Sequence, residues 1–400
     1  MIIEPKVRGF VCVTAHPEGC AANVQEQIEI ARSRGAVSGG PRRVLVVGSS
    51  TGYGLASRIE AAFGCGASTF GVFFERPPSN GRPASAGYYN AAAFERAART
   101  AGLYAGSLNG DAFSDEMKEK AAARIRAEMD GPIDLVVYSL ASPRRTDPRE
   151  NRTYKSVLKP IGTRFESKTV DTDKDLVHEI AIGPAEESEI ESTVKVMGGE
   201  DWQRWIDCLA EKGLLADGFR TIAYSYVGPE LTWPIYKNGT IGRAKEDLDR
   251  AAGEIMETHA DSNPFAGVAV NKAVVTQASS AIPVVPLYIS ILFKVMKEKG
   301  IHEGCAGQIA RLFRDRLYAA DGPVLAEDGR LHVDDLEMRA DVQAAVAEVW
   351  PSIGTANLRE LSDYEGYQAD FLKLFGFGVE AVDYGRDLDP ETALPGGKDW

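Results

Sequence analysis

VLVVGSSTGYG, residues 44–54, decides the fold of this 400-residue chain. The four aliphatic residues at its start predict a short buried strand. Gly48, Gly52 and Gly54 then predict a tight turn into a helix, where the backbone can approach a ligand closely. The start of such a helix offers N–H groups without a helical partner and the positive end of the helix dipole. The stretch therefore predicts a strand-to-helix turn that binds phosphate groups.

Outward from this turn, short apolar runs alternate with longer amphipathic segments. Such alternation is typical of a parallel sheet with helices on both faces. We expect a doubly wound, Rossmann-type α/β fold, in which ligands bind at the carboxyl ends of the strands. The predicted strands are 44–47, 69–74, 104–108, 133–138, 220–227 and 268–275, and the predicted helices are 53–63, 89–100, 114–128, 201–212 and 241–257.

Two segments interrupt this alternation. Residues 142–199 are polar, with extended pieces that predict a hairpin, and the chain from residue 282 onward is mostly helical in pattern. No shift in composition marks a second domain. We therefore expect one large domain, 1–400, with an insertion at 142–199 and substrate-side helices and a C-terminal extension at 282–400.

Charge and cysteine content exclude several classes of protein. The net charge of −13 and the pI near 5.1 argue against nucleic acid as a partner, because phosphate backbones need a basic surface. The five cysteines form no CxxC pair, which fits a reducing compartment. Cys12, His16 and Cys20 are evenly spaced but lack a fourth ligand, so we expect no metal site.

The N-terminus and the apolar stretches predict a cytoplasmic protein without a membrane segment. Residues 1–6 lack the basic-then-apolar pattern of a signal peptide. The longest apolar stretch, 281–293, contains two prolines and is shorter than the roughly 20 residues that span a bilayer.

A carboxylate follows the second predicted strand. Glu75 lies about 20 residues beyond the glycines, where an acid binds the adenosine ribose diol and repels a 2′-phosphate. This favours NADH over NADPH, although the adjacent Arg76 weakens the preference. After the third and fourth strands, Asp111-Ala112 and Leu140-Ala141 are candidates for contacts with the adenine and the nicotinamide ribose.

A tyrosine and a lysine nine positions apart supply the chemistry. They are Tyr236 and Lys245, in WPIYKNGTIGRAK, residues 233–245. A tyrosine donates a proton more readily when a cation lowers its pKa. The proline and glycines around Tyr236 predict a loop there, with Lys245 on the following helix, so that the two side chains can converge. Tyr226, at the end of the preceding strand, competes for the role of proton donor.

These motifs together resemble the FabV-type trans-2-enoyl reductases, NADH-dependent relatives of the short-chain dehydrogenases that reduce enoyl thioesters of acyl carrier protein or coenzyme A. The resemblance extends over the whole chain. It includes RGFVC (8–12), HPEGC (16–20), the turn at 48–54, the Tyr-x8-Lys pair and VVTQASSAIP (274–283).

The resemblance implies a monomeric enzyme of fatty acid synthesis. Hydride goes to Cβ of the enoyl thioester, Tyr236 stabilises the enolate as proton donor, and Tyr226 contacts the substrate. The residues that it implies for NADH are Gly48, Ser49, Ser50, Thr51, Gly52, Tyr53, Phe74, Glu75, Asp111, Ala112, Leu140, Ala141, Lys245, Val274, Val275 and Thr276.

Two points stay open from the sequence. The alternative function is an NAD(H)-dependent carbonyl or hydroxyl oxidoreductase of the short-chain dehydrogenase type, which the Tyr–Lys spacing disfavours. A cofactor-binding sensor without turnover is another alternative, but a sensor would need neither Tyr236 nor Lys245. A basic cluster in the insertion either contacts coenzyme A phosphates or an acidic carrier protein, or is a solvated face. Its members are Arg144, Arg145, Arg149, Arg152, Lys155 and Lys159.

Overall fold

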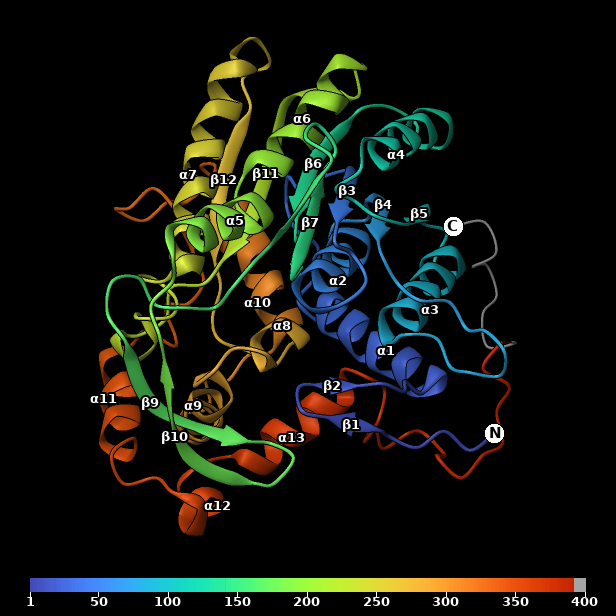
Figure 1. The fold of residues 1–400 in the computed structure, drawn as a ribbon. Coiled ribbons are helices and arrows are strands. Elements are labelled where there is room, and N and C mark those ends of the chain that lie inside the picture. Colours follow the sequence, from blue (N-terminus) through green and yellow to red (C-terminus); the bar gives the residue numbers. More distant parts are fainter. Residues whose placement is uncertain (141, 392–400) are drawn as a thin grey trace.

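The computed structural model describes residues 1–140 and 142–391 (Figure 1). Its centre is a seven-stranded sheet in the order β13-β12-β11-β6-β3-β4-β5, and every neighbouring pair of strands is parallel. From β3 the chain builds the sheet in one direction through β4 and β5, and in the other from β6 to β13. The predicted doubly wound fold is confirmed. The strands are β3 (Arg43–Val47), β4 (Ser68–Phe73), β5 (Ala105–Asn109), β6 (Ile133–Tyr138), β11 (Leu215–Ser225), β12 (Phe265–Val270) and β13 (Leu331–His332).

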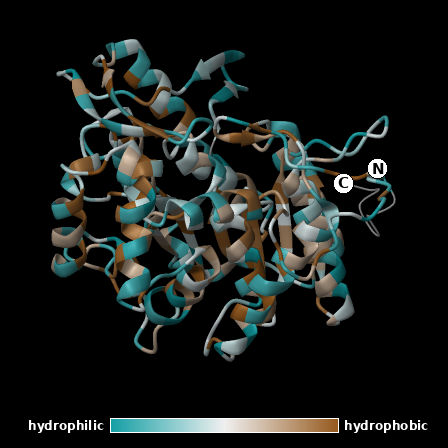
Figure 2. Cartoon of the chain, turned by 90° about the horizontal axis from the view of Figure 1, so that it is seen from below, coloured by the Kyte–Doolittle hydropathy of each residue, from teal (hydrophilic) through white to brown (hydrophobic). Residues whose placement is uncertain are grey.

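Helices cover both faces of the sheet, and the alternation of side chains in β3 shows why. Leu45 and Val47 pack into a core with α4, α6 and α7, whereas Val44 and Val46 pack against α2 and α10 on the other face. The apolar strands accordingly lie inside the molecule (Figure 2). The helices are α2 (Gly52–Ile59), α3 (Ala86–Thr100), α4 (Asp115–Glu128), α6 (Glu200–Glu211), α7 (Thr240–Thr258) and α10 (Cys305–Arg311).

The structure differs from the sequence expectations at three elements. β12 ends at Val270 rather than at residue 275, because its partner β11 ends at Ser225 and leaves no strand to pair with. β13 has only two residues and exists through its pairing with Ala269 and Val270. The N-terminal helix α1 (Pro17–Ser33) was not expected; it packs outside α2 and α3.

The insertion contains two hairpins rather than the single one expected. The first joins β7 (Arg144–Asp147) to β8 (Arg152–Lys155), and the second joins β9 (Phe165–Asp171) to β10 (Leu176–Ile182). Helix α5 (Glu187–Met197) follows. The division of the chain into a core, an insertion at 142–199 and an extension from 282 stays a prediction.

The C-terminal part contributes most of an apolar cluster below the carboxyl edge of the sheet, which residues near the N-terminus and Tyr236 also join (Figure 1). Its centre is α9 (Val285–Glu298), which is almost entirely buried and packs against α11, α13 and β9. No helix among the described residues is long and apolar enough to cross a bilayer. The remaining elements are β1 (Val7–Arg8), β2 (Val11–Cys12), α8 (Gln277–Ser280), α11 (Ala340–Val349), α12 (Leu358–Leu361), α13 (Tyr364–Lys373), the 3-10 turns η2 (Glu230–Thr232), η3 (Ala260–Ser262) and η5 (Thr355–Asn357), and the π-helical turns η1 (Glu60–Gly64) and η4 (Leu312–Leu317).

Candidate functional site

The predicted site residues gather at the carboxyl edge of the sheet. They follow six neighbouring strands: Gly48 to Tyr53 after β3, Phe74 and Glu75 after β4, Asp111 and Ala112 after β5, Leu140 after β6, Tyr226 after β11, and Val274 to Thr276 after β12. The direction of chain progression reverses between β3 and β6, and the glycine-rich turn lies at this point. A crevice at such a reversal is where doubly wound sheets bind their ligands. Ala141 lies outside the described residues.

The glycine-rich turn is packed too tightly for larger residues. A β-carbon on Gly48 would collide with the carbonyl oxygen of Ser139, at the end of β6, and one on Gly54 would collide with the carbonyl oxygen of Gly48. Helix α2 begins directly at this turn. Thr51 is its N-cap but makes no side-chain hydrogen bond to the helix, so the first N–H groups of α2 are left for another acceptor. This geometry fits a phosphate group.

The hydroxyls of the turn are directed into the protein. Ser49 is fully buried, with its hydroxyl 3.4 Å from the carbonyl oxygen of Val72. Ser50 donates a hydrogen bond of 2.7 Å to Glu75 Oε1. The resemblance implies that both serines contact NADH. In the structure their hydroxyls fix the turn against β4 and against Glu75.

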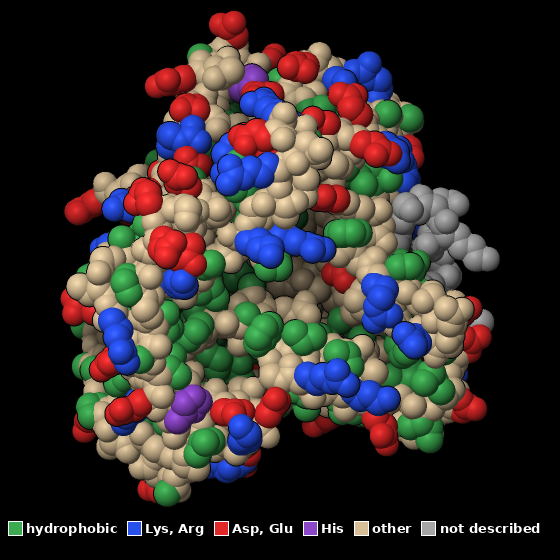
Figure 3. All heavy atoms as spheres, in the orientation of Figure 1, with side chains coloured by type: hydrophobic (Ala, Val, Ile, Leu, Met, Phe, Trp, Pro, Cys, Tyr) green, Lys and Arg blue, Asp and Glu red, His purple; other side chains and the backbone are tan. Residues whose placement is uncertain are grey.

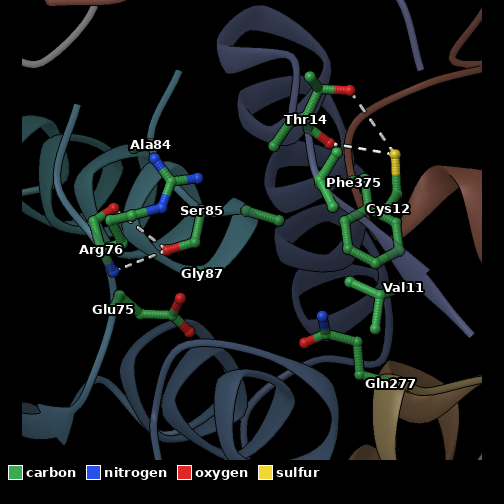
Figure 4. Close-up of a pocket in the computed structure, with 13 residues that line it drawn as sticks. Val11, Cys12, Thr14, Glu75, Arg76, Ala84, Ser85, Gly87, Gln277 and Phe375 are labelled. Atoms are coloured by element: carbon green, nitrogen blue, oxygen red, sulfur yellow. Dashed lines mark hydrogen bonds between the residues drawn. The ribbon is translucent and has the colours of Figure 1, made fainter. Parts of the chain in front are cut away.

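A pocket of about 320 Å³ opens beside Glu75 (Figure 4). Glu75 is half-buried there, and burial raises the pKa of its carboxyl group. Ser85, Gly87 and Gln277 line the pocket, and the N-terminal residues 11–15 and Phe375 close it. The preceding Phe74 is 77% exposed, which is unusual for a phenylalanine. Its ring is therefore accessible for stacking on a flat group of a ligand.

Residues after β5 and β12 complete the crevice. Asn109 exchanges two hydrogen bonds of 2.8 Å with the backbone of Glu75, which ties the ends of β4 and β5 together. Asp111 is exposed, and its carboxylate accepts a hydrogen bond from Phe113 N, whereas Ala112 is buried. Thr276 lies beside Gly52, so the segment after β12 reaches the glycine-rich turn.

Tyr236 and Lys245 lie on the elements that the sequence predicts. Tyr236 is in the turn before α7, and Lys245 is on α7, where its ammonium group donates a hydrogen bond of 2.8 Å to the carbonyl oxygen of Tyr224. Burial lowers the pKa of Lys245 to about 8. The expected lowering of the tyrosine pKa is not found: burial, and then the charge of Glu337, raise the pKa of Tyr236.

The two candidate proton donors are neighbours. The rings of Tyr226 and Tyr236 are 4.6 Å apart and meet edge to face. The hydroxyl of Tyr226 donates to Glu337 Oε1 over 2.9 Å. In the described part of the chain, no residue forms a hydrogen bond with the hydroxyl of Tyr236.

Three residues of this region are not among the site residues predicted from the sequence. Glu337, Lys272 and Tyr288 are all buried at the carboxyl edge of the sheet. Glu337 precedes α11, Lys272 follows β12, and Tyr288 is on α9, so only folding brings them together. None of them stands in a recognisable motif.

Taken together, these residues can bind a dinucleotide along the sheet edge and place a protonated tyrosine at its end. The N–H groups at the Gly48–Gly54 turn fit phosphate groups, and the carboxylate of Glu75 fits a ribose diol. Among the described residues, no group of three His, Cys, Asp or Glu side chains is arranged to hold a metal.

Three family models match successive parts of the chain. Residues 2–80 match the NAD(P)H binding domain of trans-2-enoyl-CoA reductase, and residues 82–318 match the trans-2-enoyl-CoA reductase catalytic region. Residues 325–388 match a model described as an enoyl reductase FAD binding domain.

The residues of this last segment do not fit a flavin. Its only strand, β13, leads to α11 through VDDLEMR, residues 333–339, which has no glycine and contains three acids. Acidic side chains repel a pyrophosphate, and the helices of the segment pack their apolar residues against α9.

Similar proteins are known over nearly the whole chain. An enoyl-acyl-carrier-protein reductase (NADH) of Opitutus terrae is 58% identical over 394 residues, which cover 98% of this chain and 100% of that protein. A protein of the same name from Vibrio cholerae is 57% identical, with 98% of each chain covered.

Solved structures show the same likeness. The trans-2-enoyl-CoA reductase of Clostridium acetobutulicum, in complex with NADH, has a TM-score of 0.95 and 44% identity, covering 99% of this chain and 100% of that one. The enzyme of Treponema denticola, in complex with NAD, has a TM-score of 0.93 and 48% identity, covering 97% and 98%.

Proposed function

This chain belongs to the trans-2-enoyl-CoA reductase family, and on that premise we propose that Tyr236 is the proton donor in its reaction. The chain is an NADH-dependent reductase of the trans-2 double bond of enoyl thioesters. When bound, NADH supplies the hydride for Cβ. Negative charge then develops on the thioester oxygen, where a hydrogen-bond donor that is already in place is most effective.

The observation that carries this assignment is the state of the Tyr236 hydroxyl. Burial raises the pKa of Tyr236, as it does that of Tyr226, so both hydroxyls keep their protons at neutral pH. Its neighbour Tyr226 already donates to Glu337, whereas Tyr236 has no such acceptor among the described residues. Tyr236 therefore has a proton to donate to the thioester oxygen, and Tyr226 is assigned to substrate contact.

The cofactor residues follow from the same geometry. We assign the phosphates to the Gly48–Tyr53 turn, the adenosine to Phe74, Glu75, Asp111 and Ala112, and the nicotinamide end to Leu140, Lys245 and the 274–276 segment. The N–H groups at the start of α2, the exposed ring of Phe74 and the carboxylate of Glu75 support this order.

The test is oxidation of NADH with crotonyl-CoA, followed at the nicotinamide absorbance band, for the parent and for Tyr236→Phe. The parent should turn over rapidly. The variant should bind NADH normally but lose activity by about 10²-fold or more, as expected for a missing proton donor. An active Tyr236→Phe variant would reject the assignment, and an inactive parent that binds NADH would reject the activity itself.

A pair of like charges supports a second proposal, on the thioester carrier. Arg144 and Lys155 lie directly opposite each other on the exposed face of the β7–β8 hairpin. Like charges in this position repel each other. Neither has an ion-pair partner among the described residues, although the chain is acidic overall. Of the six residues in the predicted basic cluster, Arg145 and Lys159 are instead paired with Glu200 and Glu189.

We propose that Arg144 and Lys155 bind the phosphate ester at the end of the pantetheine arm, which coenzyme A and acyl carrier protein share. The hairpin begins six residues after the end of β6. Figure 3 shows Lys and Arg side chains along the rim of a hollow, over the region where Figure 1 draws β7. An anion between the two side chains relieves their repulsion.

The test compares crotonyl-CoA with crotonyl-N-acetylcysteamine, a thioester that lacks phosphate. The double variant Arg144→Ala/Lys155→Ala should raise the KM for crotonyl-CoA about fivefold at low salt and leave that of the short thioester unchanged. Arg164→Ala, which removes an exposed arginine from the same insertion, is the matched control. Equal effects on both thioesters would reject the phosphate contact, and crotonyl-acyl-carrier-protein distinguishes the two carriers.

We also propose that the enzyme is a cytoplasmic monomer. All five cysteines are within the described residues and are free thiols, which fits a reducing compartment. Light scattering coupled to size exclusion tests the oligomeric state: a mass of about twice 43.2 kDa would contradict the proposal.

A further inference from the structure

Glu337 is a buried carboxylate at the centre of the site. Its side chain is completely inaccessible to solvent, and three donors are directed at it. The hydroxyls of Tyr226 and Tyr288 donate to Oε1 over 2.9 and 2.7 Å, and the backbone N–H of Ala273 donates to Oε2 over 2.6 Å. Burying a carboxylate is costly unless its oxygens are hydrogen-bonded, and this set of donors meets that need.

A buried cation accompanies Glu337. Lys272 is also buried, and its ammonium group donates to the carbonyl oxygen of Ala273 over 2.8 Å and lies 5.0 Å from the ring centre of Phe293. Burial raises the pKa of Glu337, whereas the charge of Lys272 and the three hydrogen bonds act in the opposite direction. Two hydroxyls and one N–H, all pointing at the carboxyl oxygens, form the partner set of an ionised carboxylate, which can only accept.

The direction of one of these hydrogen bonds matters for the reaction. Because an ionised Glu337 only accepts, the hydroxyl proton of Tyr226 must point at Glu337 and away from the substrate. Tyr226 can then offer only lone pairs to its other neighbours. Its ring lies 4.6 Å from that of Tyr236, edge to face. Of the two adjacent tyrosines, only Tyr236 keeps a proton for an oxygen that becomes negatively charged.

The same carboxylate also holds the cofactor side of the crevice. Ala273 directly precedes the 274–276 segment, whose Thr276 lies beside Gly52 of the phosphate-binding turn. Glu337 thus connects the end of β11, the start of this segment and α9, which are distant from one another in sequence.

We propose that Glu337 is a positioning residue, which keeps the hydroxyl proton of Tyr226 directed away from the substrate and so leaves Tyr236 as the single proton donor to the thioester oxygen. The inference rests on the assignment of Tyr236 as proton donor. Glu337 does not touch the reacting atoms; it acts through the hydroxyl of Tyr226.

Glu337→Gln tests the proposal because it changes the hydrogen bonding at almost constant shape. The amide oxygen can still accept from Ala273 N. The amide nitrogen, however, donates to the hydroxyl oxygen of Tyr226, so the hydroxyl proton of Tyr226 is released toward the substrate. Glu337→Gln, Tyr226→Phe and the double variant are compared for kcat with crotonyl-CoA and for NADH binding by fluorescence. Glu337→Gln should lower kcat about 10-fold in the parent but less than about twofold in the Tyr226→Phe background, since interacting residues are non-additive.

The matched control is Glu60→Gln, another buried carboxylate, which pairs with Arg314 at the far end of α2. It should lower the melting temperature and leave kcat unchanged. An unchanged kcat in Glu337→Gln, or an equal loss in both backgrounds, would overturn the proposal. Should Glu337→Gln fail to fold, Tyr226→Phe decides: the single donor Tyr236 remains in this variant, so a loss of kcat as large as that of Tyr236→Phe, with normal NADH binding, would overturn the proposal as well. Failure of the Tyr236 assignment is recognised separately, as an active Tyr236→Phe variant.

Discussion

Lys245 shows at the scale of a single residue how burial tunes the site. Its ammonium group is held by the carbonyl oxygen of Tyr224, and burial lowers its pKa from 10.5 to about 8. In the unfolded chain the lysine keeps its ordinary pKa. Between pH 8 and 10.5 the unfolded chain therefore holds a proton that the folded chain has released. The free energy of unfolding consequently rises with pH through this window. Below pH 8 the lysine is charged in both states, and its burial destabilises the folded protein by the full amount.

NADH binding should follow the opposite course with pH. If the ammonium form of Lys245 holds the ribose hydroxyls, the Kd of NADH should rise above pH 8, up to about tenfold per pH unit. In Lys245→Met the Kd should be higher and independent of pH. Fluorescence titration between pH 6 and about pH 9.5 measures both.

Lys272 is the control, because burial lowers its pKa to about 8 as well. Lys272→Met should keep the pH-dependent increase in Kd. If Lys272→Met removed this increase and Lys245→Met kept it, the titrating group would be Lys272, and the ribose assignment of Lys245 would be wrong.

At the scale of an element, α2 begins where two glycines allow the backbone to come very close. A β-carbon on Gly54 would collide with the carbonyl oxygen of Gly48, so the first turn of α2 sits directly on the end of β3. This contact aims the N–H groups of α2 into the crevice at the sheet edge. The glycines are thus required by packing at this point as well as by ligand approach.

Gly54→Ala should therefore weaken both folding and NADH binding. Overpacking a tight contact typically costs about 1–3 kcal/mol. Gly253→Ala, on α7, is the matched control: a β-carbon there meets nothing within 4 Å, and alanine should stabilise the helix by about 0.5–1 kcal/mol. Urea unfolding and NADH titration measure the two effects. Equal stability of the two variants would contradict the close approach.

At the scale of the whole molecule, the C-terminal region closes the site from outside the sheet. His16 N, which precedes α1, donates to the carbonyl oxygen of Phe375 over 2.9 Å, and the ring of His16 lies 4.8 Å from that of Tyr384. Phe375 and residues 11–15 also line the pocket beside Glu75. The part of the candidate site beside Glu75 is thus built from both ends of the chain.

A comparison of two glycines distinguishes the contact between the chain ends from backbone strain alone. Gly376 and Gly378 both have positive φ, +78° and +77°, so alanine at either should cost about 1–2 kcal/mol. Only at Gly376 would a β-carbon collide with the start of α1, at Cys20 N and the carbonyl oxygen of His16. Gly376→Ala should therefore destabilise the protein by about 1–3 kcal/mol more than Gly378→Ala, measured by urea unfolding. Equal losses would mean that the two chain ends move apart without cost.

The sequence alone predicted six of the seven strands of the sheet and the glycine-rich turn. Strand β3 and the turn to α2 lie within residues 43–54, where a continuous apolar run and the glycine spacing act between near neighbours. The same holds for Tyr236 and Lys245: a proline and two glycines placed one in a turn and the other on α7, as predicted. The helix predicted over 114–128 is likewise found as α4, with Ser114 as its N-cap.

Only the tertiary structure decided what surrounds these residues. Glu337 is 111 positions from Tyr226, and no local pattern relates a carboxylate before α11 to a tyrosine after β11. Strand β13 exists only through pairing with β12, and the pocket beside Glu75 needs Phe375 from the far end of the chain. Periodicity and turn chemistry are properties of adjacent residues, whereas the partners of a buried charge depend on how every element packs.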